Sequence, residues 1–516
     1  MDERRELFKT ALELSMTESL WGVWVTDNVS FSPFMNGIEG AYDLAGGFAS
    51  SQLWPYTIKR AGEEGGEVKI AQSGILVQPW NPVGGSNFTD DSMIQRGTMD
   101  WGLVYNPYTG LSMPKLISKV EVVAQEGLPI QKTLDFVDLS FESQIQVPED
   151  AWVDWDAENQ KFITAGEKFP EGLTSKTKST MYYIPELFET KWHDGSSFSL
   201  ADMVMYMILA FDTGKPESPI YDESTAASLE TFLSQFRGVR IVSTDPLVIE
   251  TYTDGYSLDA ENTIYGNYNL TWYPSYTYGP GAWHNIVPAM LAEENKELAF
   301  TTDKAQALEV EWTSIVAGPS LEIEAKYLDQ AASESYIPYA ATLSQYITED
   351  EATARYENLK NWYADKKHFF IGTGPYYVDE VFPVEGTITL SRFEDYMFPA
   401  SQWSVYAEPR IVTASLEGPT SVAAGEETTF DAFVSFNDEP YPSADLDRVT
   451  YTLYNEKNEV VASGEAEMIA DGQYQVVLPA DVTSQLEAGA SKLTVAVASK
   501  VVSLPAFTTY EFVVTK

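Results

Sequence analysis

The chain has 516 residues, and 77 acidic residues against 32 lysines and arginines give it a formal net charge of −45. A chain this anionic repels phosphate backbones, which excludes nucleic acid as a partner. Cysteine is absent, which excludes disulfides, thiolate nucleophiles and cysteine-bound metal centres. The hydrophobic content of 44% is enough to bury cores, and the length corresponds to roughly three to four domains. The longest apolar run, at 203–211, is about half as long as a bilayer requires, so we expect no membrane span.

The first 80 residues predict one helix and then an irregular stretch. Residues 3–17 carry apolar side chains three to four positions apart among charged ones, as an amphipathic helix does. Residues 24–80 are rich in glycine and turn signals, and they contain one short strand candidate at 68–71.

Two further helices have capping signals. Ser199 is followed three positions later by Asp202 and then by an apolar stripe, which predicts a capped helix that faces a core. Thr348 and Glu351 predict the start of another helix in the same way. We expect a strand pair at 372–392 to follow it.

The pattern changes after Pro409, where apolar residues alternate with polar ones in short runs separated by turns. Five such runs within about 105 residues predict an immunoglobulin-like β-sandwich. We therefore expect a partial lobe segment at 1–64, an α/β region at 65–405 and the sandwich at 410–516. The five runs begin at Phe430, Val449, Tyr474, Leu493 and Tyr510.

Few patterns indicate catalysis. The three histidines are not spaced as a helical metal pair, and no nucleophile elbow, phosphate-binding loop or dinucleotide fingerprint is present. Residues 154–165 begin like a calcium loop, but Asn159 and Ala165 stand where glycine and glutamate are required. We interpret that stretch as a solvated turn, and we expect no enzyme activity, no cofactor and no metal site.

Two short motifs are more specific. The first is a Trp-His-Asp-Gly turn at 192–195 that leads into the capped helix, and the second is Gly-Thr-Gly-Pro-Tyr at 372–376. Asp-Gly supplies a turn, and the glycines let the backbone bend sharply as it enters a strand. We therefore expect the motif residues to shape the fold more than to contact a ligand. They are Trp192, Asp194, Gly195, Asp202, Gly372, Thr373, Gly374, Pro375 and Tyr376.

In this order and at this separation, the two motifs resemble those of the family 5 solute-binding proteins of ABC transporters, the peptide- and nickel-binding group. The resemblance covers roughly residues 65–405. It implies a two-lobed α/β fold of the type II periplasmic-binding-protein kind, which closes around a solute and delivers it to permease subunits. It also implies a location outside the cytoplasm, in the periplasm or at the cell surface.

The order of segments departs from the family pattern. In the family the chain passes to a second lobe after the Gly-Thr-Gly-Pro-Tyr strand and then returns, whereas here the sandwich follows soon after that strand. Residues 4–28 resemble material expected near the end of a family member, and residues 1–6 lack the apolar region of a secretory signal. The expectation is a rearranged or N-terminally incomplete binding protein, anchored through a segment that the chain lacks.

Aromatic residues are dense at 271–283, which has five aromatic side chains in 13 residues. Proline and glycine forbid a long helix there, and amphipathic rings on an irregular loop suit recognition of peptides or sugars. The alternative is that these rings fill an interface between lobes. The candidates for ligand binding are Trp272, Tyr273, Tyr276, Tyr278 and Trp283, together with Trp80, Asn81, Trp101 and Tyr105.

Three functions compete. The first is the solute-binding component of an ABC importer, with a peptide or similar small solute as its ligand. The second is a surface adhesion or scaffold protein in which the binding core has a structural role. The third is an enzyme that acts on glycans with carboxylates in an aromatic cleft. The negative charge and the lack of a basic cluster favour neutral or cationic solutes over phosphates and dicarboxylates.

Overall fold

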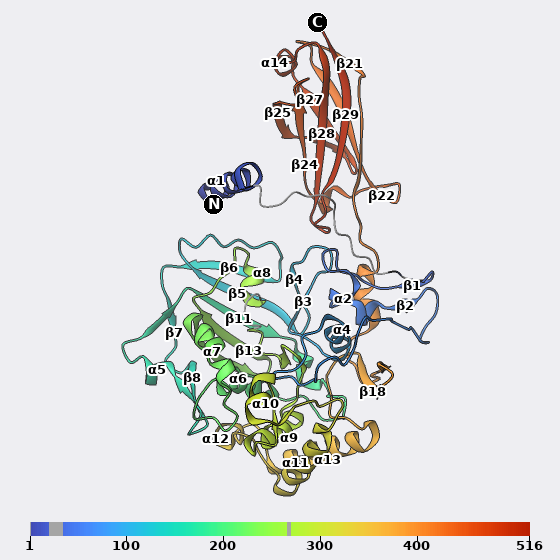
Figure 1. The fold of residues 1–516 in the computed structure, drawn as a ribbon. Helices are drawn as coiled ribbons and strands as arrows, with labels where there is room; N and C mark the ends of the chain where they lie inside the picture. The colour runs from blue at the N-terminus through green and yellow to red at the C-terminus, as the bar shows by residue number, and fades with distance from the viewer. Residues whose placement is uncertain (1, 20–32, 34, 266–269) are drawn as a thin grey trace. The chain divides into compact units, whose positions relative to one another are not determined.

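The computed structural model describes residues 2–19, 33, 35–265 and 270–516. The chain divides into two compact units, one of Met1–Tyr105 with Leu111–Trp403 and one of Asn106–Gly110 with Ser404–Lys516 (Figure 1). The first unit mixes helices with a large sheet, and the second is built almost entirely of strands. The prediction of a mixed α/β protein is confirmed at this level.

The first unit is organised around a seven-stranded mixed sheet in the order β6-β5-β11-β13-β12-β8-β9. Among these strands, β5 and β6 are parallel and the other neighbours are antiparallel. The central strands are β-branched and apolar on their buried faces, as a sheet covered by helices requires. The strands are β5 (Ile117–Gln125), β6 (Val137–Glu142), β8 (Trp152–Asp156), β9 (Lys161–Thr164), β11 (Thr177–Tyr183), β12 (Phe236–Thr244) and β13 (Leu247–Thr253).

Helix α6 (Leu200–Asp212) is deeply buried beside this sheet. Ten of its 13 residues are buried, and its apolar side chains share one core with the central strands. Helices α9 (Trp283–Glu294), α11 (Ser320–Glu334) and α13 (Glu349–Lys366) pack on one another, and α7 (Glu223–Gln235) packs on β12 (Figure 1).

The other helices of the first unit are α1 (Asp2–Leu14), η1 (Ser15–Ser19), α2 (Gly47–Ser50), α3 (Trp54–Thr57), α4 (Thr89–Thr98), α5 (Ala165–Lys168), η2 (Pro185–Glu189), α8 (Ala260–Tyr265), α10 (Thr302–Leu308), α12 (Ala340–Leu343) and η3 (Ala400–Tyr406), whose last residues fall in the second unit. The other strands are β1 (Ile38–Glu39), β2 (Lys59–Arg60), β3 (Leu103–Tyr105), β4 (Ser112–Pro114), β7 (Ile145–Val147), β10 (Leu173–Ser175), β14 (Ser275–Tyr276), β15 (Gly279–Pro280), β16 (Leu298–Ala299), β17 (Glu311–Trp312), β18 (Tyr376–Phe382) and β19 (Thr387–Arg392).

The helices with capping signals are confirmed, and so is the strand pair β18–β19. The N-terminal helix is also present, although it ends in a π turn at Ser15–Ser19. The strand predicted at 68–71 is wrong. That segment is not part of a sheet, and Ile70 is 41% exposed, because its short apolar alternation has no core to face.

The calcium-like stretch at 154–165 lies mostly in the β-hairpin of β8 and β9. Its first residue, Asp154, is buried, so the interpretation as a solvated turn is wrong at that residue. Asp154 is buried in β8, where its carboxylate oxygens accept hydrogen bonds from Lys168 and Lys215, both at 2.6 Å. Two lysines therefore occupy the oxygens that a cation would need.

The second unit consists of two five-stranded sheets around a common core. One sheet has the order β20-β22-β27-β26 with β23 on β22, and the other has the order β21-β29-β28-β24-β25. The five alternating runs seen in the sequence are β22, β24, β27, β28 and β29, and their inward residues form one hydrophobic cluster. The elements are β20 (Thr413–Glu417), β21 (Ser421–Ala423), β22 (Thr428–Phe436), β23 (Glu439–Pro440), η4 (Ser443–Asp445), β24 (Leu446–Tyr454), β25 (Val460–Glu465), β26 (Glu467–Ala470), β27 (Gln473–Leu478), α14 (Ala480–Thr483), β28 (Gly489–Ser499) and β29 (Ala506–Thr515).

Candidate functional site

The first motif forms the turn that launches α6. Gly195 has φ +88°, a left-handed conformation that glycine adopts without strain, and its N–H donates to the carbonyl of Trp192. The Asp194 carboxylate accepts hydrogen bonds from the N–H and the hydroxyl of Ser196 at 3.0 and 3.1 Å. Ser199 and Asp202 then form the predicted capping box.

Asp202 also connects the turn to helices α13 and α9 through hydrogen bonds. Its two oxygens accept a bidentate pair of hydrogen bonds from Arg355 on α13, at 2.9 and 3.0 Å. One of the same oxygens accepts from the backbone N–H of Trp283 at 3.1 Å, at the start of α9. Both charged side chains are almost fully buried, so removal of either one would leave an unpaired charge in the core.

The second motif lies directly against the first. His193 Nδ1 accepts from the N–H of Gly372 at 3.0 Å, and the other ring nitrogen lies 3.1 Å from the carbonyl of Gly374. A Cβ added to Gly372 would lie 1.8 Å from the carbonyl oxygen of Thr98. One added to Gly374 would lie 2.5 Å from the backbone nitrogen of Met99. The glycines therefore permit a close backbone approach.

The aromatic segment at 271–283 completes the same junction. Its Tyr273 hydroxyl lies 2.8 Å from the hydroxyl of Thr373, and its ring stacks on Phe198 at 5.1 Å. Just beyond it, His284 Nε2 lies 2.8 Å from the Asp194 carboxylate. Burial alone would raise the pKa of Asp194, but its interactions with His284 and Ser196 lower that pKa below its usual value.

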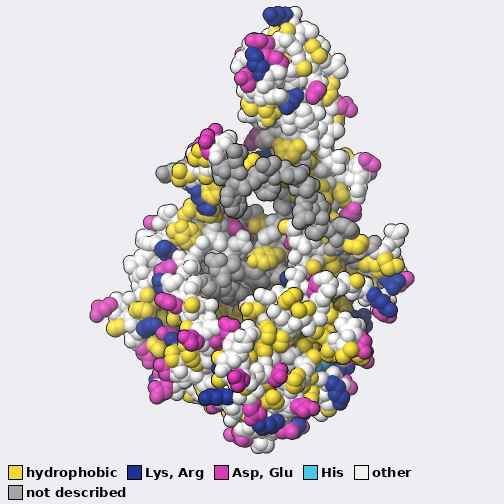
Figure 2. Space-filling model, in the orientation of Figure 1, with side chains coloured by type: hydrophobic (Ala, Val, Ile, Leu, Met, Phe, Trp, Pro, Cys, Tyr) yellow, Lys and Arg dark blue, Asp and Glu magenta, His cyan; other side chains and the backbone are white. Residues whose placement is uncertain are grey.

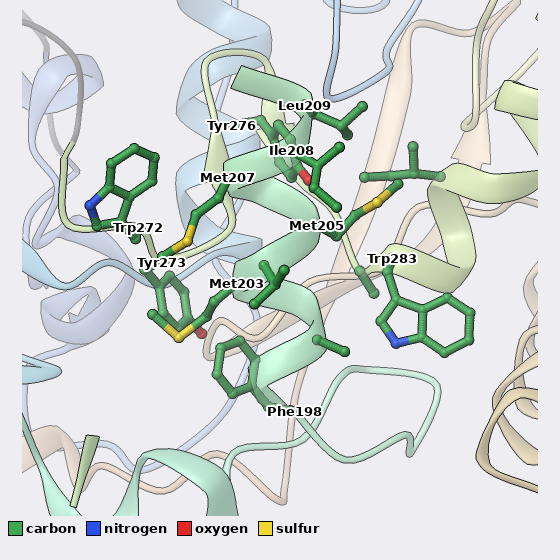
Figure 3. Close-up of a cluster of buried hydrophobic side chains, with 14 of the residues drawn as sticks. Phe198, Met203, Met205, Met207, Ile208, Leu209, Trp272, Tyr273, Tyr276 and Trp283 are labelled. Atoms are coloured by element: carbon green, nitrogen blue, oxygen red, sulfur yellow. The ribbon is translucent and has the colours of Figure 1, made fainter. Parts of the chain in front are cut away.

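Figure 3 shows the aromatic segment on both sides of α6, with Trp272 and Tyr273 on one side and Trp283 on the other. The segment is mostly irregular, as expected, but it contains the two-residue strands β14 and β15, which pair as a short hairpin, and its buried rings belong to the core. Trp272 and Tyr276 contact Tyr206 of α6, with ring centroids 6.4 and 4.8 Å apart. Trp80, Asn81, Trp101, Trp272, Tyr273, Tyr276 and Trp283 are buried, whereas Tyr105 and Tyr278 are half-buried.

Two of the predicted binding residues have their polar atoms occupied by the protein itself. The Asn81 amide donates to the carbonyls of Phe300 and Thr313 at 3.1 and 2.8 Å, and its oxygen accepts from two backbone N–H groups. The Trp272 ring nitrogen donates to the Thr251 hydroxyl at 2.8 Å. These two side chains fix the fold, and ligand contact by the other candidates stays a prediction.

Three of the buried polar atoms that have no hydrogen-bond partner among the described residues lie on side chains linked to one another through Gly279 and Phe370. They are Trp80 Nε1, Gln95 Nε2 and Tyr276 Oη. Tyr276 is the cross-strand partner of Gly279. A Cβ at Gly279 would lie 3.6 Å from both Gln95 and Phe370, and Phe370 in turn contacts Trp80 with ring centroids 5.2 Å apart.

We call Trp80, Gln95 and Tyr276 the donor cluster. Buried polar groups are nearly always hydrogen-bonded, so these three are candidates for contact with another molecule. Trp80 and Tyr276 were predicted from the sequence as binding residues, whereas Gln95 was not. A glutamine on a helix gives no sign of burial until the packing of α4 against β15 is known.

No helix among the described residues is long and apolar enough to cross a membrane. In that same part of the chain, no group of three or more histidine, aspartate or glutamate side chains is placed to hold a metal ion.

No protein-family model matches this chain, and no curated protein does. Among solved structures, one match is described as bearing on host cell surface retention of a 1.5-MDa bacterial ice-binding adhesin. It has 15% identity and a TM-score of 0.16, and it covers 21% of this chain and 33% of the adhesin chain. The CARDB domain of a Pyrococcus furiosus protein matches with 12% identity and a TM-score of 0.14, over 20% of this chain and 94% of that one. At these TM-scores the matches support no argument about function.

Proposed function

We propose that the chain is an extracytoplasmic solute-binding component of an ABC importer, of the family 5 kind, with a C-terminal immunoglobulin-like module. The observation that carries the proposal is the junction of the two motifs with the aromatic segment. His193 joins the first motif to the second, and Tyr273 joins the aromatic segment to the second. Segments separated by 100 residues or more along the chain thus form one structural unit. Type II lobes, delivery to permease subunits and the location outside the cytoplasm belong to the same proposal.

The donor cluster indicates the ligand class. Trp80 Nε1 and Gln95 Nε2 can only donate hydrogen bonds, so they suit a ligand rich in carbonyl or hydroxyl oxygens. A net charge of −45 disfavours anions, and Figure 2 shows the basic side chains dispersed over the visible face without a cluster. A neutral peptide fits both features, because its carbonyls accept hydrogen bonds and it carries no excess negative charge.

A melting screen tests the proposal. The purified chain is heated with peptides, sugars, amines and organic acids, each at low and at high salt. A ligand present at a hundredfold above its Kd should stabilise the folded chain by about 2.7 kcal/mol and so raise the Tm. We expect neutral peptides to raise the Tm with little dependence on salt. The ligand argument is wrong if only organic acids or phosphates do so, and the transport proposal itself fails if no compound in any class does.

A further inference from the structure

A buried lysine and a buried aspartate lie in contact at the base of the β3–β4 hairpin. The side chain of Lys115 is 0% exposed and that of Asp100 is 2% exposed. In this hairpin Leu103 pairs with Pro114. Asp100 lies three residues before Leu103, and Lys115 directly follows Pro114. The hairpin thereby brings the Lys115 Nζ against the Asp100 Oδ1.

Aromatic rings close off this pair from water. The Lys115 Nζ lies 3.8 Å from the ring centroid of Tyr56 and between 5.5 and 5.8 Å from three others. The same Nζ is hydrogen-bonded to the hydroxyls of Tyr56 and Tyr396. The three other rings belong to Tyr396, Phe398 and Trp403.

The Asp100 carboxyl group accepts two further hydrogen bonds. The backbone N–H of Trp101 donates to Asp100 Oδ1 at 2.9 Å, and the Tyr396 hydroxyl donates to Oδ2 at 3.2 Å. Because the Tyr396 hydroxyl also lies 2.9 Å from Lys115 Nζ, it bridges the two reacting groups. Burial raises the pKa of Asp100 and lowers the pKa of Lys115 to about 8, so both shifts favour the neutral pair.

We propose that Lys115 and Asp100 become joined by an intramolecular amide bond. A proton passes from the ammonium to the carboxylate, and the Nζ lone pair then attacks Cγ of Asp100 to form the N–C bond. The bond between Cγ and Oδ2 breaks, a second proton from the nitrogen reaches Oδ2 through the Tyr396 hydroxyl, and water leaves. The ion pair thus becomes an amide and one water molecule, with no oxidation or reduction and no co-reactant.

The amide would close a covalent loop around β3, β4 and the residues between them, 106–111. Such a link limits the freedom of the unfolded chain as a disulfide does, in a protein that has no cysteine. It would also persist when the surrounding aromatic core opens.

Mass spectrometry of the full chain tests the proposal. We expect an intact mass lower than that of the sequence by one water molecule. Trypsin should yield residues 97–119 as one peptide that lacks a water molecule, because an amidated Lys115 is not cleaved. A cyclised aspartate would also lose water, but trypsin would still cut after Lys115.

A matched variant distinguishes the amide from incidental dehydration. Lys115→Arg keeps the cation among the rings, yet its guanidinium does not form the amide, so the variant should have its full mass. The proposal is overturned if the wild-type chain has its full mass after prolonged incubation and is cut completely after Lys115. This test uses the wild-type chain alone, so its result does not depend on whether any variant folds.

Discussion

Glu324 on α11 is fully buried, and both of its carboxylate oxygens have no hydrogen-bond partner among the described residues. Burial raises the pKa of this carboxyl well above its usual value, so the folded protein binds a proton that the unfolded chain releases near pH 4. Stability is therefore lost as the pH rises above that point. Glu324→Gln mimics the protonated acid and removes this loss.

We expect the free energy of unfolding of the variant to exceed that of the wild type by an amount that grows as the pH rises above the ordinary pKa of a glutamate. Urea unfolding at several pH values measures the difference. A difference in free energy of unfolding between variant and wild type that stays constant with pH would contradict this explanation of Glu324.

Two histidines are held neutral by burial. Burial lowers the pKa of His193 to about 4 and that of His368 also to about 4, against an ordinary value of about 6.5. The unfolded chain therefore binds more protons between those values, and the stability due to each histidine is lost as the pH falls from about 6.5 to 4. NMR titration of labelled imidazoles should give midpoints near 4 in the folded chain. Midpoints near 6.5 would show that these rings are solvated.

Local contacts of single residues could be predicted from the sequence, and distant ones could not. The capping box of Ser199 and Asp202 needs only a spacing of three, which is visible in the sequence. The ion pair of Asp202 with Arg355 spans 153 positions and depends on how α13 packs. Gln95 was not predicted for the same reason, because only the fold brings its helix near Gly279.

The close approach of the Gly372 backbone to the end of α4 predicts the effect of a substitution there. Gly372→Ala places a carbon 1.8 Å from the Thr98 carbonyl, so the strand β18 must shift away from the end of α4. We expect a loss of about 3 kcal/mol in stability, measured by urea unfolding. Gly74→Ala is the control, because its added carbon meets only a methyl group of Val77 at 3.2 Å. Equal losses in the two variants would contradict a special role for the second motif.

Helices and hairpins were predicted better than the large sheet. Helix α13 and the pair β18–β19 are local in the sequence, and both were expected. The seven-stranded sheet was not, because β11 pairs with β5 on one side and with β13 on the other, more than 50 residues away in each direction. Such pairings follow from burial in three dimensions and leave little trace in the alternation of one segment.

At the scale of the whole molecule, the two sheets of the second unit should fold without the first. Their hydrophobic cluster runs from Val412 to Val514 and contains no residue from outside that stretch. A fragment of residues 404–516 should therefore give a dispersed amide spectrum and a single cooperative unfolding transition. A collapsed spectrum would show that Asn106–Gly110, which belongs to the same unit, is required.

The most direct test of solute binding is titration calorimetry of the peptide that raises the Tm most, with the wild type and two tyrosine variants. Tyr276→Phe removes a hydroxyl that has no hydrogen-bond partner among the described residues, whereas Tyr356→Phe removes one that donates to the Tyr336 carbonyl at 2.7 Å. We predict that Tyr276→Phe binds about five- to tenfold more weakly without loss of stability. Tyr356→Phe should keep its affinity and lose about 1 kcal/mol of stability. If no peptide gives a measurable heat of binding, or if Tyr276→Phe binds as tightly as the wild type, the donor cluster is not a solute site.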